Sequence, residues 1–148
     1  MMALHDELAQ SFFAHQCALL DRDFVRAAAA LACHHERLLA HMDDEERLVL
    51  PPYRELGGDA TDAPVRLFLG EHGKLREFAA DFVARVEALR AAPDDRRLLE
   101  LFDRQATYKN LMLHHDLRER NMLYPFLATR LSANEQEHLL EARRWSGG

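Results

Sequence analysis

The scarcity of helix-breaking residues is the feature that most constrains the fold of this chain. Its 148 residues include only 6 glycines and 5 prolines, while alanine, leucine, glutamate and arginine dominate. These four residue types favour helices. Apolar residues recur with helical spacing, and no segment shows the alternation typical of a strand. We therefore predict an all-α protein.

Breaks in the helical pattern divide the chain into long segments joined by short connections. The expected long helices cover about residues 6–20, 24–50, 63–91 and 95–130. Proline removes a backbone donor and clashes with the preceding turn, so Pro51 should end or bend the second helix and Pro125 should bend the fourth. Four long amphipathic helices with short connections predict an up-down-up-down antiparallel four-helix bundle. We expect one domain over residues 1–148.

Capping residues mark several of the expected helix starts. Asp23 and Asp62 precede the second and third helices, and an aspartate at this position accepts a hydrogen bond from a backbone N–H of the first turn. The segment SANE at 132–135 has the S-x-x-E form of a capping box. A short extra C-terminal helix should therefore begin there.

Charge and hydropathy argue against nucleic-acid and membrane partners. The chain has 19 basic and 25 acidic residues, for a net charge of -6, and no basic run is longer than a pair, so a nucleic-acid surface is not expected. No apolar stretch approaches the roughly 18 residues of a membrane helix. The N-terminus has no signal-peptide pattern, and Cys17 and Cys33 do not make a disulfide framework. A cytoplasmic location is the expectation.

Two phrases with the same spacing carry the strongest functional signal. The phrase HMDDEERLVLP begins at His41 and HDLRERNMLYP begins at His115, and each has a glutamate four residues on, Glu45 and Glu119, and a proline ten residues on. Residues four apart on a helix lie one turn apart on the same face. Because each pair also lies on an apolar stripe, the second and fourth helices should both direct an imidazole and a carboxylate inward.

The other two long helices each place a histidine on an apolar stripe, His15 on the first and His72 on the third. Two buried carboxylates are costly unless a cation compensates them. Imidazole suits iron, zinc, copper and nickel, and carboxylates add oxygen donors that can bridge two ions. A dinuclear iron site with bridging glutamates would give each ion about two nitrogens and two oxygens, with room for an oxo, water or diatomic ligand. The candidate ligands are His15, His41, Glu45, His72, His115 and Glu119.

Each of these residues, taken singly, could have a purely structural role. A histidine on an apolar face is commonly a hydrogen-bonded core residue, and either glutamate at the edge of its stripe would point to solvent. The repetition of the whole phrase favours the metal site. His34 and Tyr108, two turns before His41 and His115, are interpreted as core residues, with a role near the metals as the alternative.

The chain resembles the hemerythrin-like family, also called the HHE cation-binding domain. The resemblance rests on HHERLLAHMDDEERLVLP at 34–51, GEHGKLREF at 70–78 and LMLHHDLRERNMLYP at 111–125. It implies a four-helix bundle that holds a carboxylate-bridged di-iron site, with the six candidate ligands named above in the family's ligand positions. The oxygen-carrying members use a second histidine one turn after His72, where this chain has Arg76. The pattern is therefore more similar to bacterial di-iron proteins implicated in nitric-oxide stress and the repair of iron centres.

These features together lead to one expected function and two alternatives. The expected protein binds two iron ions and binds or senses oxygen or nitric oxide, or handles iron under oxidative or nitrosative stress. One alternative is a di-iron oxidoreductase acting on oxygen, peroxide or nitric oxide. The other is a bundle that holds zinc or another divalent metal without redox chemistry. The sequence leaves open whether the chain forms homo-oligomers.

Overall fold

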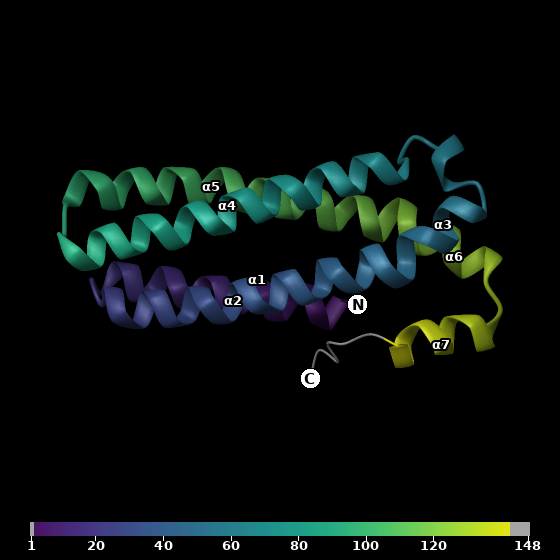
Figure 1. Cartoon of the computed structure of the whole chain (residues 1–148), viewed down its shortest axis with the longest axis horizontal. Helices are drawn as coiled ribbons and strands as arrows, with labels where there is room; N and C mark the ends of the chain where they lie inside the picture. The colour runs from purple at the N-terminus through teal and green to yellow at the C-terminus, as the bar shows by residue number, and fades with distance from the viewer. Residues whose placement is uncertain (1, 143–148) are drawn as a thin grey trace.

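Four long antiparallel helices form the body of the protein. The computed structural model describes the backbone of residues 2–142 and the side chains of residues 5–142, and over this range it contains helices and no strands. The four helices alternate in direction along one axis (Figure 1). They are α1 (Met2–Leu20), α2 (Phe24–Asp44), α4 (Val65–Ala91) and α5 (Asp95–Arg118). The predicted all-α bundle is confirmed, while residue 1 and residues 143–148 of the predicted domain lie outside the described part of the chain.

The second and fourth long helices continue beyond the body of the bundle. A π-helical turn, η1 (Glu45–Val49), leads from α2 into α3 (Leu50–Glu55), and η3 (Glu119–Leu123) leads from α5 into α6 (Tyr124–Arg130). The prolines thus bend the two helices without ending them. A 3₁₀ turn, η2 (Gly58–Ala60), follows α3.

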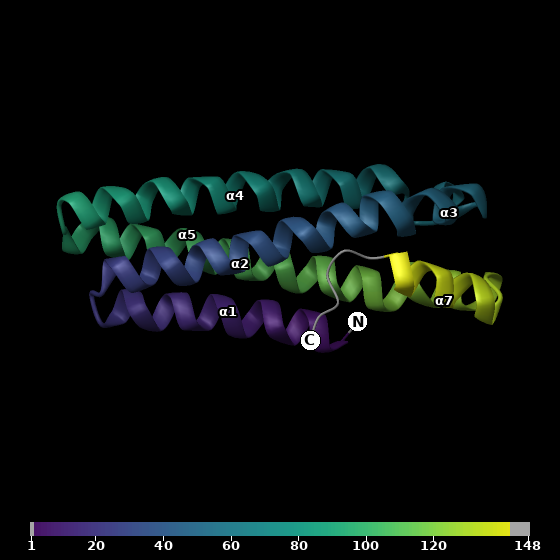
Figure 2. The same ribbon diagram turned by 60° about the horizontal axis from the view of Figure 1, so that its bottom comes forward.

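The extra helix α7 (Ala133–Ala142) lies at the α3–α6 end of the molecule in both ribbon views (Figures 1 and 2). Its last carbonyl, of Ala142, accepts a hydrogen bond of 3.0 Å from Arg47 in η1. The short C-terminal helix is therefore held against the turn that follows α2, as an addition to the four-helix bundle.

Two of the three predicted caps are present. Asp23 accepts a 3.0 Å hydrogen bond from the backbone N–H of Arg26. Ser132 and Glu135 each accept a hydrogen bond from the other's backbone N–H, at 3.2 and 3.1 Å, which completes the capping box. Asp62 does not cap α4, because Pro64 occupies the N-cap position in an extended conformation. Asp59, in the 3₁₀ turn, instead accepts the bond from the N–H of Val65 at 2.8 Å.

The apolar core consists of two clusters with a polar layer between them. The larger one fills the four-helix body and includes Leu38, Leu75 and Tyr108. The smaller one lies at the α3–α6 end and includes Leu50 and Phe68, together with Leu123. Residues 41–45, 72 and 115–119 fall between the two clusters on their helices. Apolar side chains therefore lie on both sides of that layer along the bundle axis.

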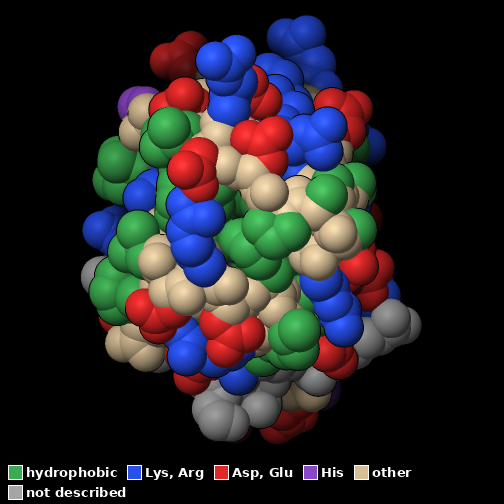
Figure 3. All heavy atoms as spheres, turned by 90° about the vertical axis from the view of Figure 1, so that its left-hand side faces the viewer, with side chains coloured by type: hydrophobic (Ala, Val, Ile, Leu, Met, Phe, Trp, Pro, Cys, Tyr) green, Lys and Arg blue, Asp and Glu red, His purple; other side chains and the backbone are tan. Residues whose placement is uncertain are grey.

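The opposite end of the bundle, where the α1–α2 and α4–α5 connections lie, carries a mixed surface. Figure 3 shows Lys and Arg side chains interspersed with Asp and Glu on this face. Such a mixture does not offer the one-sign field that binds a phosphate backbone. Within residues 2–142, no helix has the length and apolar character needed to cross a membrane.

Candidate metal centre

Both repeated phrases fold into the same unusual local structure. Proline clashes with the carbonyl four residues before it, and Pro51 lies six residues after Glu45. The turn between them widens, so that the N–H of Leu50 donates to the carbonyl of Glu45, five residues back. The second phrase repeats this arrangement from Glu119 to Tyr124. Single π-helical turns are rare and are frequently found at functional sites, and here each begins at a candidate ligand.

The wide turns bring side chains of four helices together in the polar layer. Ligand atoms of Glu45, His72, His115 and Glu119 all lie within 4.8 Å of one another, and so do those of His5, His41 and Glu119. The two carboxylates are 1% and 0% exposed. The structure therefore brings together five of the six candidate ligands and adds His5.

Glu45 directs its two carboxylate oxygens to two different histidines. Its Oε1 lies 2.5 Å from Nε2 of His41, on the same helix. Its Oε2 lies 4.0 Å from Nε2 of His72, on α4.

Glu119 has the matching arrangement. Its Oε1 contacts Nε2 of His115 on its own helix. Its Oε2 lies 3.4 Å from Nε2 of His5 and 3.9 Å from Nε2 of His41. Each carboxylate thus lies between the pair His5 and His41 on one side and the pair His72 and His115 on the other.

Most of these ligand atoms have no conventional hydrogen bond. In the part of the chain that the structure describes, Nε2 of all four histidines and all four carboxylate oxygens are buried without a hydrogen-bond partner. The ion pairs within the cluster offset part of the cost, but a buried polar atom without a hydrogen bond costs roughly 1–3 kcal/mol. Imidazole nitrogens and carboxylate oxygens are, however, the donors that divalent transition metals take. The residues present therefore fit a metal site.

The protonation states of the cluster follow from burial and mutual charge. Burial raises the pKa of Glu45 well above its usual range, and the charge of Glu119 raises it further. Burial also acts to raise the pKa of Glu119, but contacts from His115, His5 and His41 outweigh it and hold that pKa well below normal. Burial acts to lower the pKa of His115, but contacts with Glu119 and Glu71 outweigh it and raise that pKa to about 11. Burial thus favours a proton on Glu45, while Glu119 is favoured as the charged partner of His115, so a metal ion would displace protons on binding.

Arg76 does not point at the cluster. Its guanidinium makes two hydrogen bonds to the carboxylate of Glu46, at 3.1 and 2.6 Å, and its side chain is 38% exposed. Glu46 Oε1 lies 3.4 Å from Nδ1 of His72. A carboxylate on the outer nitrogen of a ligating histidine fixes its tautomer and leaves the inner nitrogen free for a metal. Arg76 therefore supports the site from outside and does not oppose a cation within it.

The fourth helix has the same outer arrangement. Nδ1 of His115 lies 3.1 Å from Oε1 of Glu71, and Nε of Arg118 donates to the same carboxylate at 3.2 Å. Burial raises the pKa of Glu71, but hydrogen bonds from His115 and Arg118 outweigh it and lower that pKa. A glutamate held by an arginine thus lies beside the outer nitrogen of both histidines, as a hydrogen-bond partner of His115 and as an ion-pair contact of His72.

The structure does not bring His15 to the cluster. Its Nδ1 lies 2.7 Å from the carbonyl of Ala27 and its Nε2 lies 2.9 Å from Nε2 of Gln105, so both ring nitrogens are engaged in the core. Because α1 and α2 are antiparallel, the end of α2 that carries His41 lies beside the start of α1, where His5 stands. His5 was missed because the first helix was expected to begin at about residue 6, whereas α1 begins at Met2. The signal was its place on the buried stripe that also carries Leu8.

His34 and Tyr108 are core residues, as expected. They are 2% and 1% exposed, and Nε2 of His34 lies 2.7 Å from the hydroxyl of Tyr108. Nδ1 of His34 lies 2.8 Å from Oγ of Ser11. Burial lowers the pKa of His34 to about 4, so it is neutral in this network.

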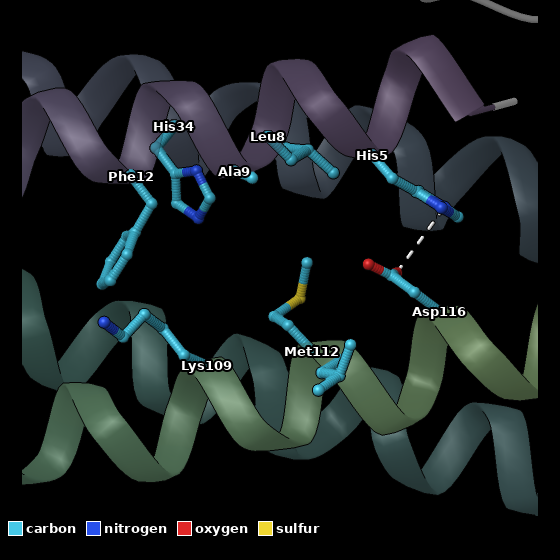
Figure 4. A pocket seen from close by; sticks show the side chains of 9 residues that line it. His5, Leu8, Ala9, Phe12, His34, Lys109, Met112 and Asp116 are labelled. Atoms are coloured by element: carbon cyan, nitrogen blue, oxygen red, sulfur yellow. Dashed lines mark ion pairs between the residues drawn. The ribbon is translucent and has the colours of Figure 1, made fainter.

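A pocket of about 180 Å³ opens between α1 and α5 beside the cluster (Figure 4). His5 and Asp116 lie at one end of it, joined by an ion pair of 3.6 Å. Leu8, Phe12 and Met112 line much of the rest. The pocket is small, mostly apolar and adjacent to a candidate ligand.

The fold and the donor set define a metal-binding four-helix bundle built from inward histidines and glutamates. The hemerythrin HHE cation binding domain model matches residues 1–127, and the chain belongs to this family. No curated protein and no solved structure matches the chain.

Proposed function

We propose that this protein holds two iron ions in a carboxylate-bridged, non-haem centre. The observation that carries the proposal is the orientation of the two glutamates, whose oxygens face different histidine pairs. One ion would be held by His5 and His41 and the other by His72 and His115, with Glu45 and Glu119 shared between them. Each ion would then have two nitrogen and two oxygen ligands, which leaves positions for a further ligand. Helical bundles commonly build di-iron sites in this way.

We further propose that the centre binds or senses oxygen or nitric oxide, or handles iron under oxidative or nitrosative stress. Iron supplies redox chemistry and an open coordination position when bound. The chain supplies an enclosure, since apolar clusters lie on both sides of the polar layer. The adjoining pocket, at about 180 Å³, suits a ligand of a few atoms better than a large organic substrate.

Reconstitution with iron tests both parts of this proposal. Protein loaded anaerobically with ferrous iron should contain two irons per chain by elemental analysis. Exposure to air should produce the near-ultraviolet absorption of an oxo-bridged ferric pair, and nitric oxide should change the visible spectrum of the ferrous form. A site that takes up one ion, or that stays colourless because it prefers zinc, would contradict the di-iron proposal. The variant with His15→Ala is the matched control and should load as the wild type does.

A further inference from the structure

The hydroxyl of Tyr124 is a buried polar group near the cluster that does not belong to a candidate ligand. Its oxygen is buried and has no hydrogen-bond partner within the part of the chain that the structure describes. Burial raises its pKa most, and the charges of Glu45 and Glu119 together with a contact from the Glu119 side chain raise it further, so the hydroxyl lies near Glu119.

The backbone fixes the position of Tyr124. It is the first residue of α6 and follows the wide turn that begins at Glu119, to whose carbonyl its N–H donates. The next residue is Pro125, which limits backbone rotation further. The side chain therefore starts from a rigid point one wide turn away from a candidate ligand.

The other two tyrosines of the chain show what an ordinary buried hydroxyl does in this fold. The hydroxyl of Tyr53 donates to the carbonyl of Ala63 at 2.8 Å and lies 2.9 Å from Oγ1 of Thr61. That of Tyr108 is bonded to His34. Since buried polar groups are normally paired, the unpaired hydroxyl of Tyr124 indicates a partner that comes from outside the chain.

We propose that Tyr124 donates a hydrogen bond to the small ligand that binds at the metal pair, an inference that rests on the proposed function. Metal ions would draw charge from Glu45 and Glu119 and make both weaker acceptors for this hydroxyl, so a bound anion would compete with them for its hydrogen bond. A phenol with an ordinary pKa of about 10 keeps its proton at neutral pH and acts as a donor. The ligand class is a small anion or diatomic molecule with a lone pair on the atom that faces Tyr124.

Azide binding to the oxidised, iron-loaded protein tests the inference. Azide is titrated into the wild type and into the variants Tyr124→Phe and Tyr53→Phe, with iron content, visible spectra and melting temperature recorded for each. Loss of a hydrogen bond to an anion should weaken azide binding roughly tenfold in Tyr124→Phe, with two irons per chain retained. Tyr53→Phe should bind azide as the wild type does but melt at a lower temperature, because it loses a satisfied hydrogen bond. Tyr124→Phe in iron-free form should melt no lower than the wild type.

Three results would overturn the inference, and they are distinguishable. Equal azide affinity in Tyr124→Phe and the wild type would show that the hydroxyl does not contact the ligand. Loss of iron from Tyr124→Phe, or loss of a visible charge-transfer band present in the wild type, would make Tyr124 a metal ligand in place of a donor. Failure of the wild type itself to take up iron would refute the proposed function, and this inference with it.

Discussion

Replacement of Glu45 by leucine should stabilise the metal-free protein while abolishing its response to metal. Glu45 is 1% exposed, and neither carboxylate oxygen has a hydrogen-bond partner among the described residues. Burial and the charge of Glu119 raise its pKa, so in the metal-free protein its charged form is disfavoured and its oxygens lack hydrogen bonds. Removal of such a group by an apolar one of similar size should gain about 1–3 kcal/mol. For a chain of this size that gain corresponds to an increase in melting temperature of roughly 3–10 °C.

Thermal and denaturant unfolding with a chelator, then with added metal, would measure both effects. The wild type should gain about 2.7 kcal/mol when free metal is a hundred times its Kd, whereas Glu45→Leu should gain nothing. Glu100→Leu is the matched control, because Glu100 is exposed on α5; its stability should change by no more than about 0.5 kcal/mol and its response to metal should remain. A metal-free Glu45→Leu protein that is less stable than the wild type would refute the reasoning, since it would mean that Glu45 holds the fold together.

Three further outcomes follow from the same geometry. His5→Ala should lower the metal content found by elemental analysis, whereas His15→Ala should keep its metal and lose about 1–3 kcal/mol in a denaturant melt; the reverse pattern would restore His15 as a ligand. Arg76→Ala should weaken metal binding roughly 10–100-fold in a chelator competition, and an unchanged Kd would mean that it does not position His72. In metal-free protein, burial lowers the pKa of His34 from 6.5 to about 4. As the pH falls through this range, His34 is protonated in the unfolded state before the folded state. The free energy of unfolding should therefore decrease, by about 3 kcal/mol in all. His34→Gln should show a shallower loss of unfolding free energy over that range, and an equal slope would show that other groups account for it.

The helices and most of the candidate ligands could be read from local pattern. Helical periodicity and breaking residues act over a few positions, which is why the bundle, the capping box at Ser132 and the inward pairs at Glu45 and Glu119 were all anticipated. The prolines were expected to bend or end their helices, but the form of the bend, a π-helical turn at each, was not. A helix can accommodate a proline by a kink or by a π-helical turn. Which of the two forms depends on how the residues on either side of the turn pack.

The choice between His5 and His15 required the tertiary structure. Both lie on the buried stripe of α1, so periodicity ranks them equally; only the antiparallel register of α1 against α2 places one beside His41 and the other beside Ala27. The direction of Arg76, away from the cluster and onto Glu46, and the approach of Tyr124 to the carboxylates have the same origin. An apolar stripe on a helix specifies which side chains are buried. The neighbour of each buried side chain is set by the axial register between the helices, which depends on the packing of the whole core.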